Sequence, residues 1–364
     1  MANGSYVCYR LNMKKERVFV GLSGGVDSSV AAKRLVERGY DVVGVFIKVW
    51  QPAFIECNWE AERLDAMRVA AHLGIPFLTC DAEDAYKRHV ADYMVEEYRQ
   101  GRTPNPDVMC NEFVKFGAFY EWAKAHGAEK VATGHYARVQ DEGSQHTLHV
   151  ANDVAKDQTY FLARIAQDAL NHALFPIGDS LKSEIREEAR RAGLPTHKKA
   201  DSQGICFLGT IDIREFLSHY VNLSPGVVID ENGTIIGEHS GALLYTLGQR
   251  HGFRISCSDG SIGPHYVIAR DIDKNTITVS ETPHARAPQA PITLSRIHEL
   301  GSGVSERMDA VFRYHGKRIP VHFGKRAGKS AILIPETGME DTPAAGQLAV
   351  FYRNDECVGC GVIE

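Results

Sequence analysis

The stretch VFVGLSGGVDSSVAAKRL, from Val18 to Leu35, decides the fold. An apolar run typical of a buried strand leads into a loop of glycines and serines, and an amphipathic helix begins at about Asp27. Glycine lets the backbone come close to a ligand, and the free N–H groups at the start of a helix attract anions. The stretch therefore predicts a phosphate-binding loop between a strand and a helix, although a tight connection alone could use the same residues.

The sequence around this loop alternates between strand-like and helical patterns up to about residue 200. Apolar runs rich in β-branched residues recur at 41–50, 76–81 and 130–137. Apolar residues at helical spacing lie between them, at 60–75 and 115–128. This alternation predicts an α/β domain with a parallel sheet covered by helices.

Beyond about residue 210 the pattern changes to hairpins. Short apolar runs pair around turn residues at 226–239, 266–281 and 348–364, and the first of these turns contains Asn232-Gly233. Prolines at 283, 288 and 291 indicate a linker. We expect a flexible tail at 1–15, a catalytic domain at 16–209, a small central domain at 210–286 and a C-terminal β-barrel at 287–364.

The composition is that of a globular protein with several domains. The chain has 364 residues, of which 44% are hydrophobic and 24% charged. No apolar run approaches the ~20 residues of a membrane helix, and residues 1–15 lack the apolar core of a secretory signal. Eight cysteines are too few for a disulfide scaffold. We therefore expect a cytoplasmic protein with no membrane partner.

The net charge of −5 hides one strongly basic segment near the C-terminus. Between residues 307 and 329 the only acidic residue is Asp309. The segment could face RNA phosphates, or it could be the solvated face of a strand pair. Its basic residues are Arg307, Arg313, Lys317, Arg318, Lys325, Arg326 and Lys329.

The loop SGGVDS, residues 23–28, resembles the pyrophosphate loop of ATP pyrophosphatases. It differs from the GxxxxGK[ST] loop because no lysine follows its glycines. The resemblance implies that ATP is cleaved between its α and β phosphates and that a substrate oxygen is adenylated. Asp27 suits a magnesium-related role, because a carboxylate beside polyphosphate suits Mg²⁺. GMP synthetases carry a similar loop, so the adenylated substrate stays open at this point.

Two cysteines lie in polar surroundings. Cys110 follows Pro104 and Pro106, where a helix is expected to begin at about Asn111. A helix N-terminus lowers the pKa of a thiol, and the polar neighbours argue against burial, although most lone cysteines are small buried hydrophobes. Cys206 follows a polar, cationic stretch. Two thiols with an adenylating loop indicate sulfur transfer, in which one sulfur carries a persulfide and the other resolves it.

Motifs across nearly the whole chain resemble the tRNA-specific 2-thiouridylases. The resemblance implies that sulfur replaces O2 of the wobble uridine, position 34, with release of AMP and pyrophosphate. It also implies ATP and Mg²⁺, lysine, glutamate and glutamine tRNAs, and a persulfide-carrying donor or relay protein. We separately expect the enzyme to be a monomer. The motifs are SGGVDS (23–28), GRTPNPDVMCN (101–111), TGHYAR (133–138), KDQTYFL (156–162), DSQGICF (201–207), YTLGQRHG (245–252) and AGQLAVFY (345–352).

The resemblance also implies a role for particular residues. Cys206 would accept sulfur as a persulfide, Cys110 would attack that persulfide or resolve it as a disulfide, and Asp107 would be the general acid or base. Asn105, Pro106 and Asp107 would meet the target base. The residues that would bind the nucleotide are Gly21, Leu22, Ser23, Gly24, Gly25, Val26, Asp27, Ser28, Ile47 and Gly134. The residues that would contact tRNA elsewhere are His135, Lys156, Asp157, Gln158, Arg313, Tyr314 and Gln347.

Some features depart from this pattern or leave it open. Ile47 stands where the family usually has methionine, and Cys360 departs from the pattern of the terminal strand. Cys357 and Cys360 form a C-x-x-C without a second ligand pair, so we expect packing there and no metal site held by the protein alone. Two other classes remain possible, another adenylating enzyme such as an amidotransferase and a non-catalytic RNA-binding or sulfur-relay protein.

Overall fold

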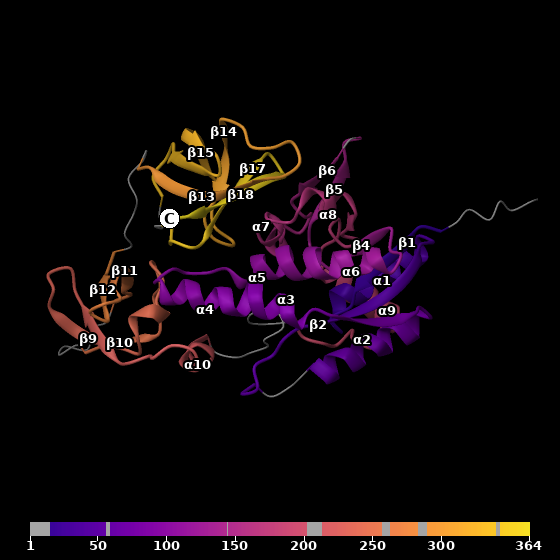
Figure 1. Cartoon of the computed structure of the whole chain (residues 1–364), viewed down its shortest axis with the longest axis horizontal. Coiled ribbons are helices and arrows are strands. Elements are labelled where there is room, and N and C mark those ends of the chain that lie inside the picture. Colours follow the sequence, from indigo (N-terminus) through magenta and orange to yellow (C-terminus); the bar gives the residue numbers. More distant parts are fainter. Residues whose placement is uncertain are drawn as a thin grey trace, which may run out of the picture.

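The computed structural model describes residues 15–55, 59–143, 145–201, 213–256, 263–282, 290–339 and 343–364. Cys206 and most of the expected linker lie outside these residues. The described chain forms three parts, an N-terminal α/β domain, a central β domain and a C-terminal barrel (Figure 1). This arrangement confirms the predicted fold class.

The N-terminal domain is built on a parallel sheet of order β3-β2-β1-β4-β7. Helices cover both faces, because Val18 and Val20 pack with residues of α1 and α2, whereas Phe19 packs with the helix that carries Cys110. Its strands are β1 (Arg17–Gly21), β2 (Asp41–Lys48), β3 (Phe77–Asp81), β4 (Lys130–Ala132) and β7 (Ala173–Leu174). Its helices include α1 (Val26–Glu37), α2 (Trp59–Leu73), α8 (Gln167–Asn171) and α9 (Lys182–Arg191).

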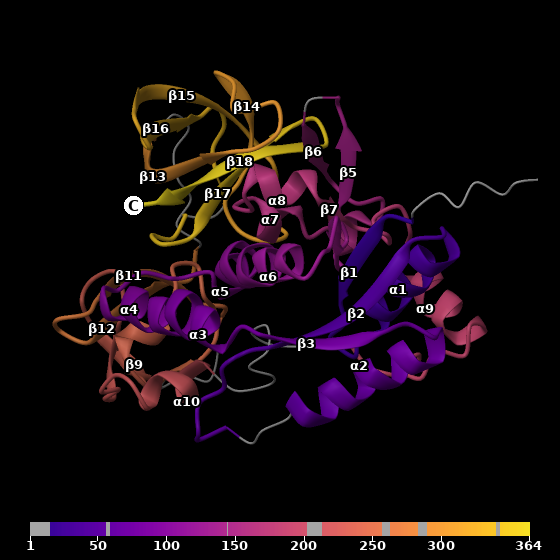
Figure 2. The same ribbon diagram turned by 45° about the vertical axis from the view of Figure 1, so that its right-hand side comes forward.

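Two longer helical segments lie on the barrel side of this sheet (Figure 2). The first joins α3 (Glu83–Tyr86), η1 (Lys87–Ala91) and α4 (Asp92–Arg99), and the second joins α5 (Pro106–Met109), η2 (Cys110–Ala118) and α6 (Phe119–Ala125). The expected start at Asn111 is wrong, because Asn105 caps the helix by accepting a hydrogen bond from the Val108 N–H at 3.2 Å. Proline at the first helical position loses no hydrogen bond, which permits this earlier start.

The C-terminal domain is a closed barrel of order β13-β16-β15-β14-β17-β18, in which β13 also pairs with β18. The hairpin of β5 (Arg138–Asp141) and β6 (His146–His149) leaves the N-terminal domain and extends this sheet through β18. The barrel strands are β13 (Ile292–Glu299), β14 (Arg307–Val311), β15 (Ile319–Ala327), β16 (Ser330–Pro335), β17 (Leu348–Arg353) and β18 (Glu356–Ile363).

The central domain is a sheet of order β10-β9-β8-β12-β11. The three hairpins predicted from the sequence are present, two in this domain as β8–β9 and β11–β12 and one in the barrel as β17–β18. Its elements are α10 (Ile213–Ser218), β8 (Gly226–Ile229), β9 (Ile235–His239), η4 (Ala242–Leu244), β10 (Phe253–Ile255), β11 (Tyr266–Asp271) and β12 (Thr276–Ser280). The remaining short helices, η3 (Val154–Lys156) and α7 (Thr159–Leu162), belong to the N-terminal domain.

The barrel packs directly on the N-terminal domain. One apolar cluster contains Val108 and Cys110 together with Leu348 and Cys360 of the barrel. Gln347 fixes the same contact, since its Nε2 donates to the carbonyl oxygens of Thr103 and Pro104 at 3.1 and 3.0 Å. In the described ranges, no helix is both long and apolar enough to cross a membrane.

Candidate active site

The glycine-serine loop lies where the strand order of the N-terminal sheet reverses. β1 lies between β2 and β4, so the loops after β1 and β4 leave the same edge of the sheet, which is where open α/β sheets bind ligands. Gly24 has a φ of 72°, and the Ser29 hydroxyl donates to the Gly25 carbonyl at 2.6 Å. The loop therefore lies at the start of the twelve-residue helix α1, as predicted.

Gly134 and Ile47 shape the space around this loop. A Cβ on Gly134 would lie 2.5 Å from Ser28 N and 2.7 Å from the Asp27 carbonyl carbon. Gly134 thus permits close contact between the loop after β4 and the start of α1. Ile47 is 5% exposed, and its Cδ1 would lie 3.5 Å from a Cβ on Gly21, so it forms an apolar wall beside the loop.

A lysine that the sequence analysis did not identify holds Asp27. Lys182 Nζ lies 2.7 and 2.8 Å from the two carboxylate oxygens of Asp27, and Tyr136 OH donates to Oδ1 at 3.0 Å. Lys182 is 155 residues away in the chain and opens α9, so no local pattern distinguishes it from an ordinary helix lysine. Its side chain is only 12% exposed, which strengthens the ion pair relative to a surface pair.

Lys182 also reaches Asp201, the last described residue before the segment that contains Cys206. The distance from Nζ to Asp201 Oδ1 is 2.9 Å, and Lys156 and Arg186 pair with the same carboxylate. Burial opposes ionisation of Asp201, but Lys182 and its cationic neighbours lower the pKa to about 2. Asp201 is therefore ionised at neutral pH and ties the start of that segment to the loop.

Asp27 carries a carboxylate beside the loop that could hold a magnesium ion arriving with a nucleotide. Among the described residues, no three His, Cys, Asp or Glu side chains gather as they would around a bound metal. Mg²⁺ often uses one or two protein carboxylates and completes its shell with phosphates and water. Asp27 can supply one such carboxylate, but the oxygens are occupied by Lys182 and Tyr136 in this conformation.

Cys110 differs from the prediction in both its burial and its acidity. Its side chain is fully buried, and burial raises the pKa of the thiol to about 11 against the opposing effect of Lys115. The expected low pKa is wrong for this conformation, because Cys110 lies inside a continuous helix and not at its N-terminus. Cys110 opens the π-helical segment η2, and such segments often occur at functional sites.

We expect Cys110 to react slowly with iodoacetamide in the free protein. With a pKa of about 11, only ~0.1% of the thiol is ionised at pH 8, against about a quarter for a free cysteine of pKa ~8.5. The labelling rate should rise about tenfold per pH unit up to about pH 11. Peptide mapping of the labelled protein measures this rate, and labelling at pH 8 as fast as in the unfolded chain would contradict the buried state.

Lys115 connects the Cys110 helix to the nucleotide loop. Its Nζ lies 3.3 Å from His135 Nε2, and His135 Nδ1 lies 2.7 Å from Thr133 Oγ1. Burial first, and Lys115 second, lower the pKa of His135 well below its usual value. Because an ammonium group can only donate, Nε2 of the neutral ring accepts and Nδ1 carries the proton. His135 is thus a neutral link beside Gly134.

The other residues expected to contact tRNA are held in different ways. Asp157 accepts from Ala151 N and Thr159 Oγ1, and Gln158 Oε1 accepts from Tyr136 N. To contact tRNA, these side chains and His135 would have to give up these internal hydrogen bonds. Their contact with tRNA stays a prediction. Arg313 is exposed in the basic segment, and the ring of Tyr314 lies 4.3 Å from that of Phe161.

Two further predictions concern residues 105–107, which are expected to meet the target base and are called the base-binding segment, and the C-x-x-C of β18. Asn105, Pro106 and Asp107 lie together at the start of the Cys110 helix, half-buried. Cys357 and Cys360 are fully buried in β18, and Cys360 Sγ donates to the Ala163 carbonyl at 3.5 Å. Burial raises the pKa of Cys360 to about 12, which is consistent with a packing role.

The fold and the loop define a class, an α/β nucleotide-binding enzyme domain followed by two small β domains. Three family models match the chain in succession, a tRNA methyl transferase HUP domain over residues 16–210, a tRNA methyl transferase PRC-barrel domain over 214–281 and an aminomethyltransferase β-barrel domain over 292–363.

Curated relatives match over nearly the full length. The tRNA-specific 2-thiouridylase MnmA of Pediococcus pentosaceus is 41% identical over 96% of this chain and 95% of its own length. The proteins of the same name from Streptococcus thermophilus and Enterococcus faecalis are each 42% identical over 96% of this chain and cover 95% and 96% of their own lengths. The chain therefore belongs to the tRNA-specific 2-thiouridylase family.

One solved structure shows a much weaker likeness. A 4-thiouridine synthetase in complex with RNA and ATP is 20% identical and has a TM-score of 0.36, covering 56% of this chain and 50% of that one.

Proposed function

We propose that the protein uses ATP to adenylate O2 of the wobble uridine of tRNA and then replaces that oxygen with sulfur. O2 attacks the α phosphate of ATP, and the bond to pyrophosphate breaks. Sulfur then attacks C2, and the C2–O bond breaks as AMP leaves. Adenylation is needed because the carbonyl oxygen of a uridine is a poor leaving group, whereas AMP is a good one.

The sulfur comes from a persulfide on Cys206, loaded by a persulfide-carrying donor protein. Either the terminal sulfur attacks C2 and Cys110 then releases it, or Cys110 first displaces it as sulfide. Both routes end with a Cys110–Cys206 disulfide, which a thiol reductant must open before the next turnover. Asp107, three residues before Cys110, takes and returns the protons that these steps require.

One observation supports these roles, namely that the Cys110 helix and Asp201, the described residue before the segment of Cys206, are both tied to the nucleotide loop. The Cys110 helix is tied to it through Lys115, His135 and the close approach of Gly134 to Ser28. Asp201 is tied to it through Lys182, which pairs with both Asp201 and Asp27. Cys206 lies five residues after Asp201 and lies outside the described residues, and five residues of chain span at most ~18 Å.

Lys182 has a role in the binding of ATP. When ATP binds, Lys182 turns from Asp27 to the phosphates, and Asp27 becomes free to hold Mg²⁺. The ion would neutralise phosphate charge when it is bound. The substrate set expected from the resemblance, lysine, glutamate and glutamine tRNAs, and a monomeric state in the cytoplasm complete the proposal.

We expect Lys182→Met to lower tRNA-dependent ATP–pyrophosphate exchange by about 100-fold, because one cation that stabilises developing phosphate charge is lost. Lys33→Met is the matched control, since Lys33 is similarly buried (18% exposed) but pairs with Glu37 and Glu188. The control should keep exchange within about twofold. If the two folded variants had the same rate of ATP–pyrophosphate exchange, Lys182 would have no role in the reaction beyond its ion pairs with Asp27 and Asp201.

The proposed function is tested by incubating the protein with tRNA, ATP and a persulfide donor and analysing the tRNA by mass spectrometry. We expect 2-thiouridine at position 34, which should form only when ATP is present and in equal amount to the AMP released. The domain names of the matching models mention methyl transfer, so a parallel reaction should contain S-adenosylmethionine. Methylated uridine without any thiolated product would overturn the proposal.

A further inference from the structure

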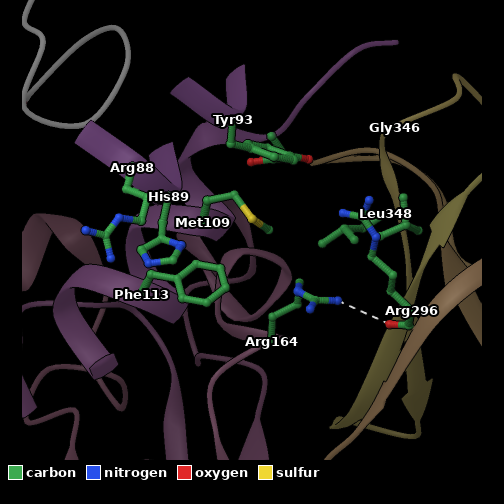
Figure 3. A pocket seen from close by; sticks show the side chains of 11 residues that line it. Arg88, His89, Tyr93, Met109, Phe113, Arg164, Arg296, Gly346 and Leu348 are labelled. Carbon is green, nitrogen blue, oxygen red and sulfur yellow. Dashed lines mark hydrogen bonds between the residues drawn. The ribbon is translucent and has the colours of Figure 1, made fainter. Parts of the chain in front are cut away.

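A cavity of about 270 Å³ lies between the helices of the N-terminal domain and the barrel. One wall carries the rings of His89 and Phe113, which stack at 4.4 Å with their planes 16° apart. The opposite wall carries Arg296 of β13, and Asn105, the first residue of the base-binding segment, also lines the cavity (Figure 3). The cavity therefore borders the place where the target uridine is proposed to bind.

The cavity is electropositive. Three arginines line it, and Arg164 is neutralised by Glu112, which it contacts with two hydrogen bonds of 2.6 and 3.1 Å. Within the described part of the chain, Arg88 and Arg296 have no carboxylate at salt-bridge distance. Two exposed arginines with no carboxylate partner among the described residues, beside an aromatic wall, favour an anionic ligand with a flat ring.

The backbone at Arg296 is strained. Its φ is 49°, a left-handed conformation that suits glycine, and it lies in a bulge where β13 changes register against β18 between Ser295 and His298. A non-glycine residue held this way costs on the order of 1 kcal/mol. Arg164 Nη1 donates to the Arg296 carbonyl at 3.2 Å, so the cavity itself helps to hold this conformation (Figure 3).

We propose that this cavity binds one nucleotide of the tRNA next to the target uridine. Its phosphate lies against Arg296, its base lies against the wall of His89 and Phe113, and Arg88 contacts the neighbouring phosphate. An unstacked base held on an aromatic ring and an arginine on its phosphate are the contacts by which proteins hold single-stranded RNA. This inference rests on the proposed function, because it takes tRNA as the substrate.

The strain at Arg296 provides a variant that separates binding from folding. Arg296→Gly removes the cation and relieves the φ of 49°, so its melting temperature should be equal or higher while binding weakens. We expect affinity for an anticodon stem-loop RNA, measured by fluorescence anisotropy, to fall about tenfold. The slope of log affinity against log salt should fall by about one. The control Arg38→Gln changes an exposed arginine at the far end of α1 and should bind within about twofold of the parent protein.

Neutral methylphosphonate linkages on either side of the target uridine locate the contact. One linkage should weaken binding to the parent protein and have no effect on Arg296→Gly. If Arg296→Gly binds RNA as tightly as the parent, or if no linkage shows this dependence, the inference is wrong. A further outcome is that Arg296→Gly loses the binding of uridine monophosphate or inorganic phosphate that the parent protein shows and yet binds RNA as tightly as the parent. That result would overturn the inference and identify a site for a small ligand. These are binding measurements, so they remain decisive even if the parent protein thiolates nothing.

Discussion

Replacing Cys110 with alanine is expected to abolish thiolation, by at least ~1,000-fold, and to leave tRNA-dependent ATP–pyrophosphate exchange within a few fold of the parent enzyme. The two activities should respond differently because the adenylation step needs the nucleotide loop, whereas the sulfur-transfer step needs the Cys110 thiol. Alanine is the appropriate substitution because the site is fully buried in an apolar cluster, where a serine hydroxyl would lack a partner. Cys206→Ala should show the same division.

Cys80→Ala is the matched control for this experiment. Cys80 is also fully buried, belongs to the same apolar cluster, and has a pKa that burial raises to about 12. Its replacement should cost a similar amount of stability and leave thiolation intact. Full activity of Cys110→Ala, or equal losses in the Cys80 and Cys110 variants, would remove Cys110 from the reaction.

Gly134→Ala is expected to destabilise the protein by about 3 kcal/mol and to abolish measurable ATP binding. The added Cβ would lie 2.5 Å from Ser28 N and 2.9 Å from Ser28 Cα. These are backbone atoms at the start of α1, so neither can turn aside as a side chain could. The loop must therefore move away from β4, and a displacement of about 1 Å at such a site can cost 100-fold. Thermal unfolding and nucleotide titration measure the two effects.

Gly263→Ala serves as the control, because a Cβ there meets no atom of the described residues within 4 Å and φ is not in the left-handed range. It should change stability by only a few tenths of a kcal/mol, toward greater stability if at all. If Gly134→Ala unfolds at the same temperature as this control and binds ATP normally, the contact between the two loops does not position the nucleotide site.

The local features of the fold were predictable from the sequence. The alternation of β-branched apolar runs with helical patterns predicted the parallel sheet, the Asn232-Gly233 turn predicted the first central hairpin, and SGGVDS predicted the loop at the start of α1. Each of the individual strand, turn and loop patterns behind these predictions is contained in fewer than about twenty consecutive residues. Such patterns report backbone conformation and one buried face, which is what secondary structure depends on.

The features that were missed depend on long-range contacts. Lys182 is 155 residues from Asp27, and the sequence contains no mark of their pairing. The β5–β6 hairpin leaves its domain to pair with β18, more than 200 residues later. The polar residues before Cys110 suggested exposure, but the barrel residues Leu348 and Cys360 cover the same cluster. Burial and pKa at this site are therefore properties of the assembled domains.

The most direct test follows the oxygen that sulfur replaces. A tRNA carrying oxygen-18 at O2 of the wobble uridine is incubated with the protein, ATP and a persulfide donor, and the products are analysed by mass spectrometry. Adenylation at O2 predicts one labelled oxygen in AMP for each 2-thiouridine formed. Label found in water or pyrophosphate, or AMP formed while the label stays in the tRNA, would contradict it.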